Sequence, residues 1–278
     1  MLSGGFFEKP LLAHLSCDQN DAKRCFFMPA NRAVSYSVSQ NFLTCQKTIR
    51  RLIGRTTIKK TDHVLEIGAG KGHITRALLD VCREVTAYEI DPRLGESLRK
   101  NLGERENLRL VFCDFLAASL PARGDYKVFS NIPFSITTAI VRKLASAPNP
   151  PKETWLVVEK GAAKRLLGTP RETAMSLSLK PFFELSLAYH FAREDFHPMP
   201  RVDCVLLHLA RRDAPDIGRG ERAAFSAFIK EEPGRFLSKK QISTALRLGK
   251  LPPAGASAEM LYVQWLCLFR CWRQFQGS

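Results

Sequence analysis

The stretch Asp62-His63-Val64-Leu65-Glu66-Ile67-Gly68-Ala69-Gly70-Lys71-Gly72 decides the fold of this chain. Its first six residues, 62–67, have the length and apolar character of a short buried β-strand. The glycines at 68, 70 and 72 let the backbone turn sharply and approach a ligand without an intervening side chain. A helix is expected directly after them, over residues 74–82. This order of strand, glycine turn and helix is typical of the first unit of an α/β domain that binds a cofactor.

The same alternation continues through the following 130 or so residues. Apolar runs predict further strands at 85–90, 108–112, 126–130, 155–158, 183–191 and 204–209. Helical spacing predicts helices at 93–102, from 135 or 137 onward, and at 162–167. Before the glycine stretch, Thr44 is expected to cap a helix that ends near residue 53. The pattern predicts an α/β fold, a Rossmann-like, mainly parallel and doubly wound sheet.

The spacing of the apolar residues changes from about residue 212. Aromatic and aliphatic residues then recur at helical spacing, which predicts a small all-helical domain with an aromatic core. The first 34 residues show no clear period. We therefore expect a loosely ordered extension at 1–34, a catalytic domain at 35–211 and a helical domain at 212–278.

The formal charge of +15 on 278 residues is unevenly placed. Lys and Arg are in excess in 1–60 and in 212–278, whereas 61–211 is nearly balanced. Basic flanks around a neutral centre suit a polyanion that is gripped outside the active site. The helical domain is therefore expected to bind nucleic acid. The alternative is that the basic flanks only aid solubility.

Other classes of protein are disfavoured by the composition. No apolar run reaches about 18 residues, so we expect no membrane span, and the N-terminus lacks the pattern of a secretory signal. The eight cysteines form no Cys-x-x-Cys pair, so neither a disulfide framework nor a metal site is indicated. A reduced, cytoplasmic setting is the default expectation.

Candidate site residues follow the expected strands, where ligands of open α/β sheets bind. Glu89 ends the second strand and is placed to accept hydrogen bonds from ribose hydroxyls. Asp114 ends the third strand and suits an adenine amino group, although it could instead cap a helix. The glycine spacing is G-x-G-x-G and differs from the G-x-G-x-x-G of dinucleotide-binding enzymes.

A tetrapeptide at the end of the fourth strand, Asn131-Ile132-Pro133-Phe134, indicates which kind of ligand the site could bind besides a cofactor. Pro133 fixes the path of the preceding carbonyls. The Asn131 side chain and a backbone carbonyl could then hold an exocyclic amino group, while Phe134 stacks on the base that carries it. The alternative is an Asn cap beside a core Phe. Phe196 could stack on the other face of the base, with core packing as its alternative.

Five ordered motifs resemble the rRNA adenine N6-dimethyltransferases, and the likeness is greatest to the Erm branch. They are residues 39–43 (SQNFL), 66–72 (EIGAGKG), 89–91 (EID), 131–134 (NIPF) and 196–200 (FHPMP). The resemblance covers about 35–275. The last position of the fourth motif is often Tyr in this family, and Phe134 keeps the ring without the hydroxyl.

The resemblance implies methyl transfer from S-adenosylmethionine to N6 of an adenine in 23S rRNA, with macrolide–lincosamide–streptogramin B resistance as the outcome. It implies that the cofactor is held by Asn41, Leu43, Gly68, Glu89, Asp114 and Asn131. Asn131 and Phe134 would receive the adenine. We expect a loop adenosine as substrate, because such a base costs little to extrude, and methylation before ribosome assembly is complete. A monomer without a metal is expected.

Four alternatives remain open at this point, and one of them is a DNA adenine methylase. A small-subunit rRNA dimethylase has the same motifs, and a non-catalytic RNA-binding or transcription-factor relative could keep the same fold. A dinucleotide-linked oxidoreductase would share the glycines and Glu89, but it would leave 131–134 and the basic ends without a role.

Overall fold

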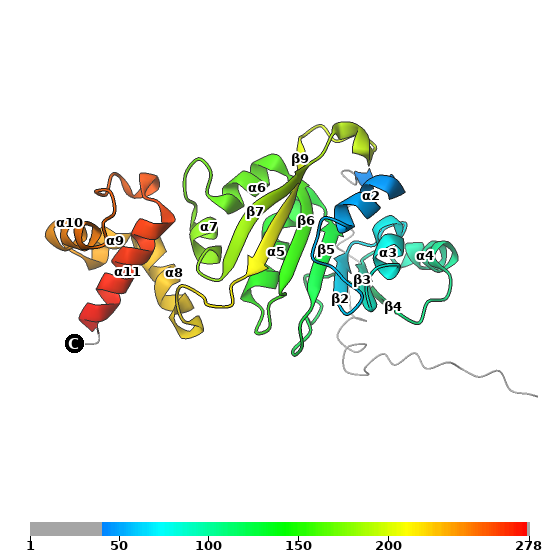
Figure 1. Cartoon of the computed structure of the whole chain (residues 1–278), viewed down its shortest axis with the longest axis horizontal. Coiled ribbons are helices and arrows are strands. Elements are labelled where there is room, and N and C mark those ends of the chain that lie inside the picture. Colours follow the sequence, from blue (N-terminus) through cyan, green and yellow to red (C-terminus); the bar gives the residue numbers. More distant parts are fainter. Residues whose placement is uncertain (1–40, 277–278) are drawn as a thin grey trace, which may run out of the picture.

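The structure is a computed structural model and describes residues 41–276 (Figure 1). The expected extension at 1–34 and the first residues of the expected catalytic domain, including Ser39 and Gln40, lie outside the described residues. No helix within 41–276 is long and apolar enough to cross a membrane.

A seven-stranded sheet with the order β4-β3-β2-β5-β6-β9-β7 forms the centre of the fold. Strands β2 to β6 are parallel, whereas β9 runs antiparallel to both β6 and β7. The expected mainly parallel, doubly wound sheet is therefore confirmed. The strands are β2 (His63–Ile67), β3 (Glu84–Glu89), β4 (Leu108–Phe112), β5 (Lys127–Asn131), β6 (Glu153–Glu159), β7 (Phe183–His190) and β9 (Cys204–Arg211).

The strand order places a topological switch point between β2 and β5. From β2 the chain adds β3 and β4 on one side, then returns to add β5 and β6 on the other. Ligands of open α/β sheets bind outside the carboxyl ends of the strands at such a point. Gly68 follows β2 and Asn131 ends β5, so the fold brings the glycine turn and the 131–134 loop to the same place.

Helices cover both faces of the sheet because successive strand residues point to opposite sides. Val64 joins the core shared with α2, α3 and α4, whereas Leu65 joins the core shared with α5 and α6. Figure 1 shows α3 and α4 beside β2, β3 and β4. The helices are α2 (Gln46–Ile53), α3 (His73–Leu79), α4 (Gly95–Leu102), α5 (Thr137–Ser146), α6 (Lys160–Leu167) and α7 (Ala174–Leu179).

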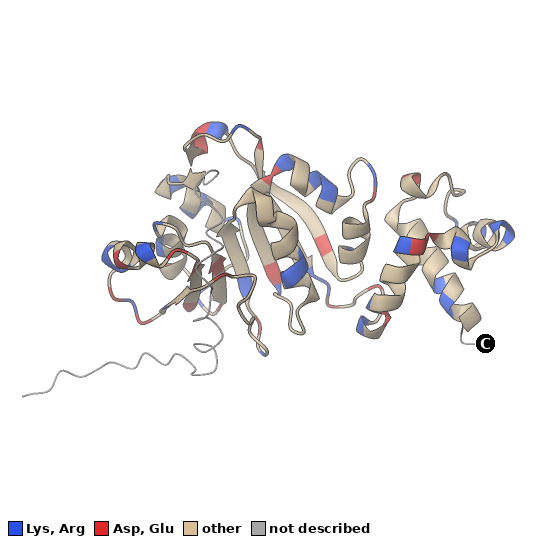
Figure 2. Ribbon diagram, turned by 180° about the vertical axis from the view of Figure 1, so that it is seen from behind, with Lys and Arg blue, Asp and Glu red and all other residues tan. Residues whose placement is uncertain are grey.

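Residues after β9 form a group of helices at one end of the molecule (Figure 1), and Figure 2 shows Lys and Arg residues on these helices. They are α8 (Arg222–Glu231), α9 (Pro233–Phe236), α10 (Lys239–Leu248) and α11 (Tyr262–Gln276). Their core is aromatic, as the spacing predicts: the Phe228 ring lies 5.5 Å from Trp272 and 5.6 Å from Phe269. This core is continuous with the one under α5, α6 and α7.

Some local expectations were wrong. Cys45, not Thr44, is the N-cap of α2, and its side chain makes no capping hydrogen bond. Asp91 accepts from the Arg93 backbone N–H and caps a 3₁₀ turn, so α4 begins only at Gly95. Helix α7 was not anticipated. Neither was a second, two-stranded sheet of β1 (Phe42–Leu43) and β8 (Phe196–His197), whose strands are antiparallel.

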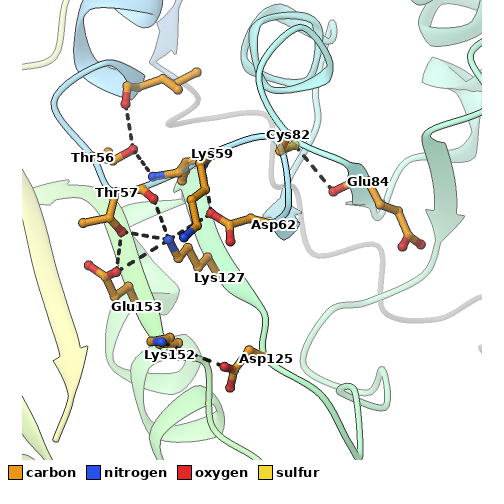
Figure 3. A network of polar contacts seen from close by, with 12 residues as sticks. Thr56, Thr57, Lys59, Asp62, Cys82, Glu84, Asp125, Lys127, Lys152 and Glu153 are labelled. Carbon is orange, nitrogen blue, oxygen red and sulfur yellow. Dashed lines mark hydrogen bonds and ion pairs between the residues drawn. The ribbon is translucent and has the colours of Figure 1, made fainter. Parts of the chain in front are cut away.

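A buried lysine network ties the starts of β5 and β6 to the segment before β2 (Figure 3). The Lys127 Nζ donates to the Thr57 carbonyl at 2.6 Å, and it lies 2.9 Å from Asp62 Oδ2 and 3.7 Å from Glu153 Oε1. Glu153 also contacts His208 at 3.0 Å. Since the Lys127 side chain is only 7% exposed, its ammonium depends on these partners in place of water.

Candidate active site

A cleft of about 1010 Å³, counted to its open mouth, lies at the switch point between β2 and β5. Of the eight distinct residues that the sequence nominates, seven line it. These are Asn41, Leu43, Gly68, Glu89, Asp114, Asn131 and Phe134. They come from β1 and the residue before it, from the turn after β2, and from the ends of β3 and β5 and the loops that follow β4 and β5, so segments far apart in the sequence meet here.

Each glycine of the turn has positive φ, and two of them also have close neighbours. Gly68 has φ 77°, and a Cβ there would meet no heavy atom within 4 Å. A Cβ on Gly70 would lie 3.1 Å from the Phe42 ring, and one on Gly72 would lie 3.0 Å from Leu102. Gly68 thus presents bare backbone to the cleft, while Gly70 and Gly72 allow the turn to pack under its neighbours.

The Glu89 carboxylate organises the turn as well as facing the cleft. Its Oε2 accepts from the Gly70 N–H at 2.8 Å, and its Oε1 accepts from the N–H groups of Ile90 and Asp91 at 2.9 and 3.0 Å. The side chain is almost fully buried. An ionised carboxylate has about four acceptor positions, so capacity remains for a ligand hydroxyl.

The sequence resemblance implies that Glu89 helps to hold S-adenosylmethionine. On that expectation, replacing Glu89 with alanine should weaken the binding of this cofactor at least about tenfold, because the change leaves the Gly70 N–H without its acceptor. Glu89→Gln keeps one acceptor oxygen and should bind between the two. Isothermal titration with S-adenosylmethionine measures both variants. An affinity for Glu89→Ala equal to that of the unaltered chain would show that Glu89 does not take part.

Asp114 lines the cleft and caps a turn, and the alternative that it caps a helix is wrong because no helix follows it. Its Oδ1 accepts from the Leu116 N–H at 2.8 Å, within a turn that does not continue as an α-helix. Lys143 from α5 donates to the carbonyls of Leu116 and Ala118 and lies over the Phe115 ring. The wall that carries Asp114 is therefore tied to the helix that follows the 131–134 loop.

The Asn131 side chain is held by a backbone carbonyl of the opposite wall. Its Nδ2 donates to the Asn41 carbonyl at 2.7 Å, which directs Oδ1 away from Asn41. The neighbouring Ser130 Oγ accepts from the Ile67 N–H at 2.7 Å and joins the ends of β5 and β2. Phe134 is half-buried on the cleft wall, and Thr137 donates to its carbonyl at 3.0 Å as α5 begins.

The expectation that Phe196 faces a base is not met in this structure. Phe196 is 3% exposed, is absent from the cleft lining, and packs 5.1 Å from the Phe191 ring. The reason is the pairing of β8 with β1, which sets Phe196 opposite Leu43 and within the core below the cleft. The alternative of core packing is the correct one for this conformation.

Glu66 is a cleft residue that the sequence argument did not single out. It is 1% exposed, and its Oε2 has no hydrogen-bond partner among residues 41–276. Burial raises the pKa of Glu66 to about 8, the charge of Glu89 acts in the same direction, and Thr75 opposes them. An acid inside an otherwise apolar strand, directly before the glycine turn, is the signal that could have identified it.

The raised pKa of Glu66 predicts a pH-dependent stability in the absence of ligands. Between about pH 4.5 and 8 the folded state holds a proton that the unfolded state releases, so stability falls as pH rises through this window. Glu66→Gln removes the proton exchange. Urea denaturation at pH 5 to 9 should therefore show an advantage for Glu66→Gln that grows with pH, and parallel curves would contradict this.

Within residues 41–276, no group of three or more His, Cys, Asp or Glu is arranged to hold a metal ion. The polar residues of the cleft lining include three acids (Glu66, Glu89 and Asp114), two amides (Asn41 and Asn131), Lys71, His73 and Tyr88. They are suited to hydrogen bonding with a nucleoside, an amino group or both.

Similarity to known proteins agrees with this geometry. The pattern of the family described as "Ribosomal RNA adenine dimethylase" matches residues 32–232. An "rRNA adenine N-6-methyltransferase" of Limosilactobacillus reuteri is 34% identical over 241 residues, which cover 85% of this chain and 96% of the relative. One of the same name from Lysinibacillus sphaericus is 33% identical and covers 88% and 99%.

Solved structures give the same picture. The crystal structure of the 23S rRNA methyltransferase ErmE has a TM-score of 0.74 and 30% identity, covering 84% of this chain and 100% of that one. A dimethyladenosine transferase from Plasmodium falciparum, at 21% identity and a TM-score of 0.63, shares the fold. On the family match and the identity to these relatives, the chain belongs to the ribosomal RNA adenine dimethylase family and is an rRNA adenine N6-methyltransferase.

Proposed function

We propose that this enzyme methylates N6 of one adenine in 23S rRNA, with S-adenosylmethionine as donor, and thereby confers macrolide–lincosamide–streptogramin B resistance. The observation that carries the proposal is the meeting of the glycine turn and the 131–134 loop in one cleft. The likeness to ErmE, a 23S rRNA methyltransferase, favours the large subunit over the small one. We also propose that the enzyme acts in the cytoplasm as a monomer, and that it methylates the rRNA before ribosome assembly is complete.

The chemistry of the cleft suits S-adenosylmethionine. The buried Glu66 Oε2 is a polar atom without a partner in residues 41–276, Glu89 retains acceptor capacity, and Gly68 leaves open space beside its backbone. Glu89 would hold the ribose hydroxyls and Asp114 the adenine amino group. Asn41, Leu43 and Gly68 would surround the amino-acid end. When bound, this cofactor supplies an electrophilic methyl group.

The 131–134 loop would position the substrate base. Asn131 Oδ1 faces away from Asn41 and would accept from the N6 amino group, together with a backbone carbonyl of the loop. Those hydrogen bonds draw the nitrogen towards a pyramidal, nucleophilic geometry. The protein thus contributes mainly alignment. No general base is needed, because a methylated ammonium is acidic enough to lose its proton to water.

Phe134 is expected to contribute by stacking alone. Phe134→Ala should weaken the productive binding of the extruded base by about 1–3 kcal/mol, the usual value of base–aromatic stacking. Phe134→Tyr keeps the ring and should retain most of the activity. Single-turnover methylation of a 23S rRNA transcript measures both variants, and equal losses in the two would mean that the ring does not stack.

Primer extension on rRNA from cells that express the chain tests the proposal. N6-dimethyladenosine disturbs base pairing, so a new stop in 23S rRNA, together with growth on a macrolide, is the expected result. A stop in 16S rRNA alone would replace this proposal with a small-subunit dimethylase. The absence of a stop in both would refute rRNA dimethylation.

A further inference from the structure

A second cavity, of about 780 Å³ counted to its open mouth, lies where the sheet meets the C-terminal helices. It is lined by Pro150, Phe182, Phe183, Arg211, Arg212, Asp213, Pro215, Arg219 and Arg222. Pro150 precedes β6 and Arg211 ends the antiparallel β9. The cavity is therefore at the amino ends of the parallel strands, whereas the active-site cleft is at their carboxyl ends.

The residues that line this cavity carry an excess of positive charge. Four guanidinium groups line it against one carboxylate, that of the exposed Asp213. Arg211 pairs with Asp125 at 3.1 Å, and Arg212 pairs with Glu184 at 2.9 Å and with Asp216 at 3.8 Å. By contrast, Arg219 and Arg222 form no ion pair with any residue in 41–276.

Both unpaired arginines are nevertheless held in place. The Arg219 Nη1 donates to the Pro148 carbonyl at 2.7 Å, and the Arg222 Nη1 donates to the Ala145 carbonyl at 2.9 Å. The Arg222 guanidinium also lies 4.1 Å from the centroid of the Phe182 ring. Burial, reinforced by the charge of Arg219, lowers the pKa of Arg222. Two positive groups that form no ion pair within residues 41–276 thus face one cavity, and Asp213 is the one acidic residue of its lining.

We propose that this cavity binds a phosphate group of the rRNA backbone, with Arg219 and Arg222 as its main ligands. Guanidinium groups match phosphate because they donate parallel N–H bonds in a fixed plane. The inference rests on the proposed function, since it takes rRNA as the partner. A strand of about seven residues spans roughly 23 Å, so this contact is remote from the target base and serves to position the RNA.

The test compares two double variants that remove the same charge. Arg219→Gln/Arg222→Gln removes the proposed ligands, and Lys100→Gln/Arg105→Gln removes two exposed cations near the end of α4, away from the cavity. The binding of a 23S rRNA transcript is measured by fluorescence anisotropy at several salt concentrations. The first variant should bind about tenfold more weakly, with a salt slope lower by about 1 for the lost phosphate contact. The control should change less than about twofold.

Further readouts separate a phosphate contact from loss of structure. The arginine variant should raise KM for RNA at unchanged kcat and unchanged affinity for S-adenosylmethionine. Arg219→Lys/Arg222→Lys keeps the charge but lacks the planar guanidinium, so it should restore the salt slope and only part of the affinity. Equal RNA binding by the two double variants would overturn the inference, as would a charge-conserving variant as weak as the Gln variant.

Two outcomes assign the failure to its source. If the unaltered chain binds and methylates the transcript while the arginine variant does so equally well, only the cavity proposal fails. If the unaltered chain binds no rRNA transcript, the proposed function fails as well. Calorimetry with inorganic phosphate tests whether the cavity binds a free anion in place of an RNA phosphate. Tight binding of free phosphate that does not compete with RNA would make the cavity a small-anion site and would overturn the RNA assignment.

Discussion

Replacing Asn131 with alanine should lower the rate of methyl transfer by about 100- to 1000-fold, the range found when one preorganised hydrogen-bonding group is removed from an active site. The amide links two walls of the cleft through its 2.7 Å bond to the Asn41 carbonyl. It is also the side chain proposed to hold the N6 amino group. Single-turnover transfer of a labelled methyl group to a 23S rRNA transcript measures the effect.

The matched variant is Asn131→Asp, which keeps an acceptor oxygen but cannot donate to Asn41. If the acceptor role of the side chain dominates, Asn131→Asp should retain more activity than Asn131→Ala. If the hydrogen bond to Asn41 dominates, the two variants should be equally impaired. Thermal unfolding checks that both variants remain folded. Full activity of Asn131→Ala would remove the 131–134 loop from the mechanism.

Replacing Lys127 with methionine should destabilise the fold by about 3–5 kcal/mol, the usual cost of removing one partner from a buried ion pair. The change leaves Asp62 and Glu153, whose side chains are 15% and 14% exposed, without their cation. It also removes the donor to the Thr57 carbonyl. Urea denaturation measures the loss, and the change should act on stability with no effect specific to the distant cleft.

The control for this change neutralises the acids as well. Lys127→Met/Asp62→Asn/Glu153→Gln should recover part of the lost stability, because no uncompensated charge then stays buried. A triple variant even less stable than Lys127→Met would mean that hydrogen bonds, and not charge, dominate the network. Unaltered stability of Lys127→Met would show that water replaces the ammonium at no cost.

The sheet and most of the cleft follow from the sequence because they depend on local patterns. Each buried strand is marked by its own apolar run, and the carboxyl ends of parallel strands meet at one edge. Glu89, Asp114 and Asn131 end or directly follow their strands, so this rule alone brings them together with Gly68.

The features that the sequence did not reveal depend on contacts between distant segments. Phe196 is buried because Phe196–His197 pairs with Phe42–Leu43, some 150 residues earlier in the chain, and no local signal marks that pairing. The Lys127 network joins Thr57, Asp62 and Glu153, which are unremarkable alone. The second cavity likewise forms only where the end of β9 and the start of α8 lie beside the loop before β6.

The most direct test is nucleoside mass spectrometry of 23S rRNA incubated with the protein and S-adenosylmethionine that carries an isotopically labelled methyl group. The account predicts that the label will be found in N6-methylated adenosine from 23S rRNA, and that the Asn131→Ala protein will transfer almost none. Label on another base, or on adenosine at equal levels with the Asn131→Ala protein, would contradict it.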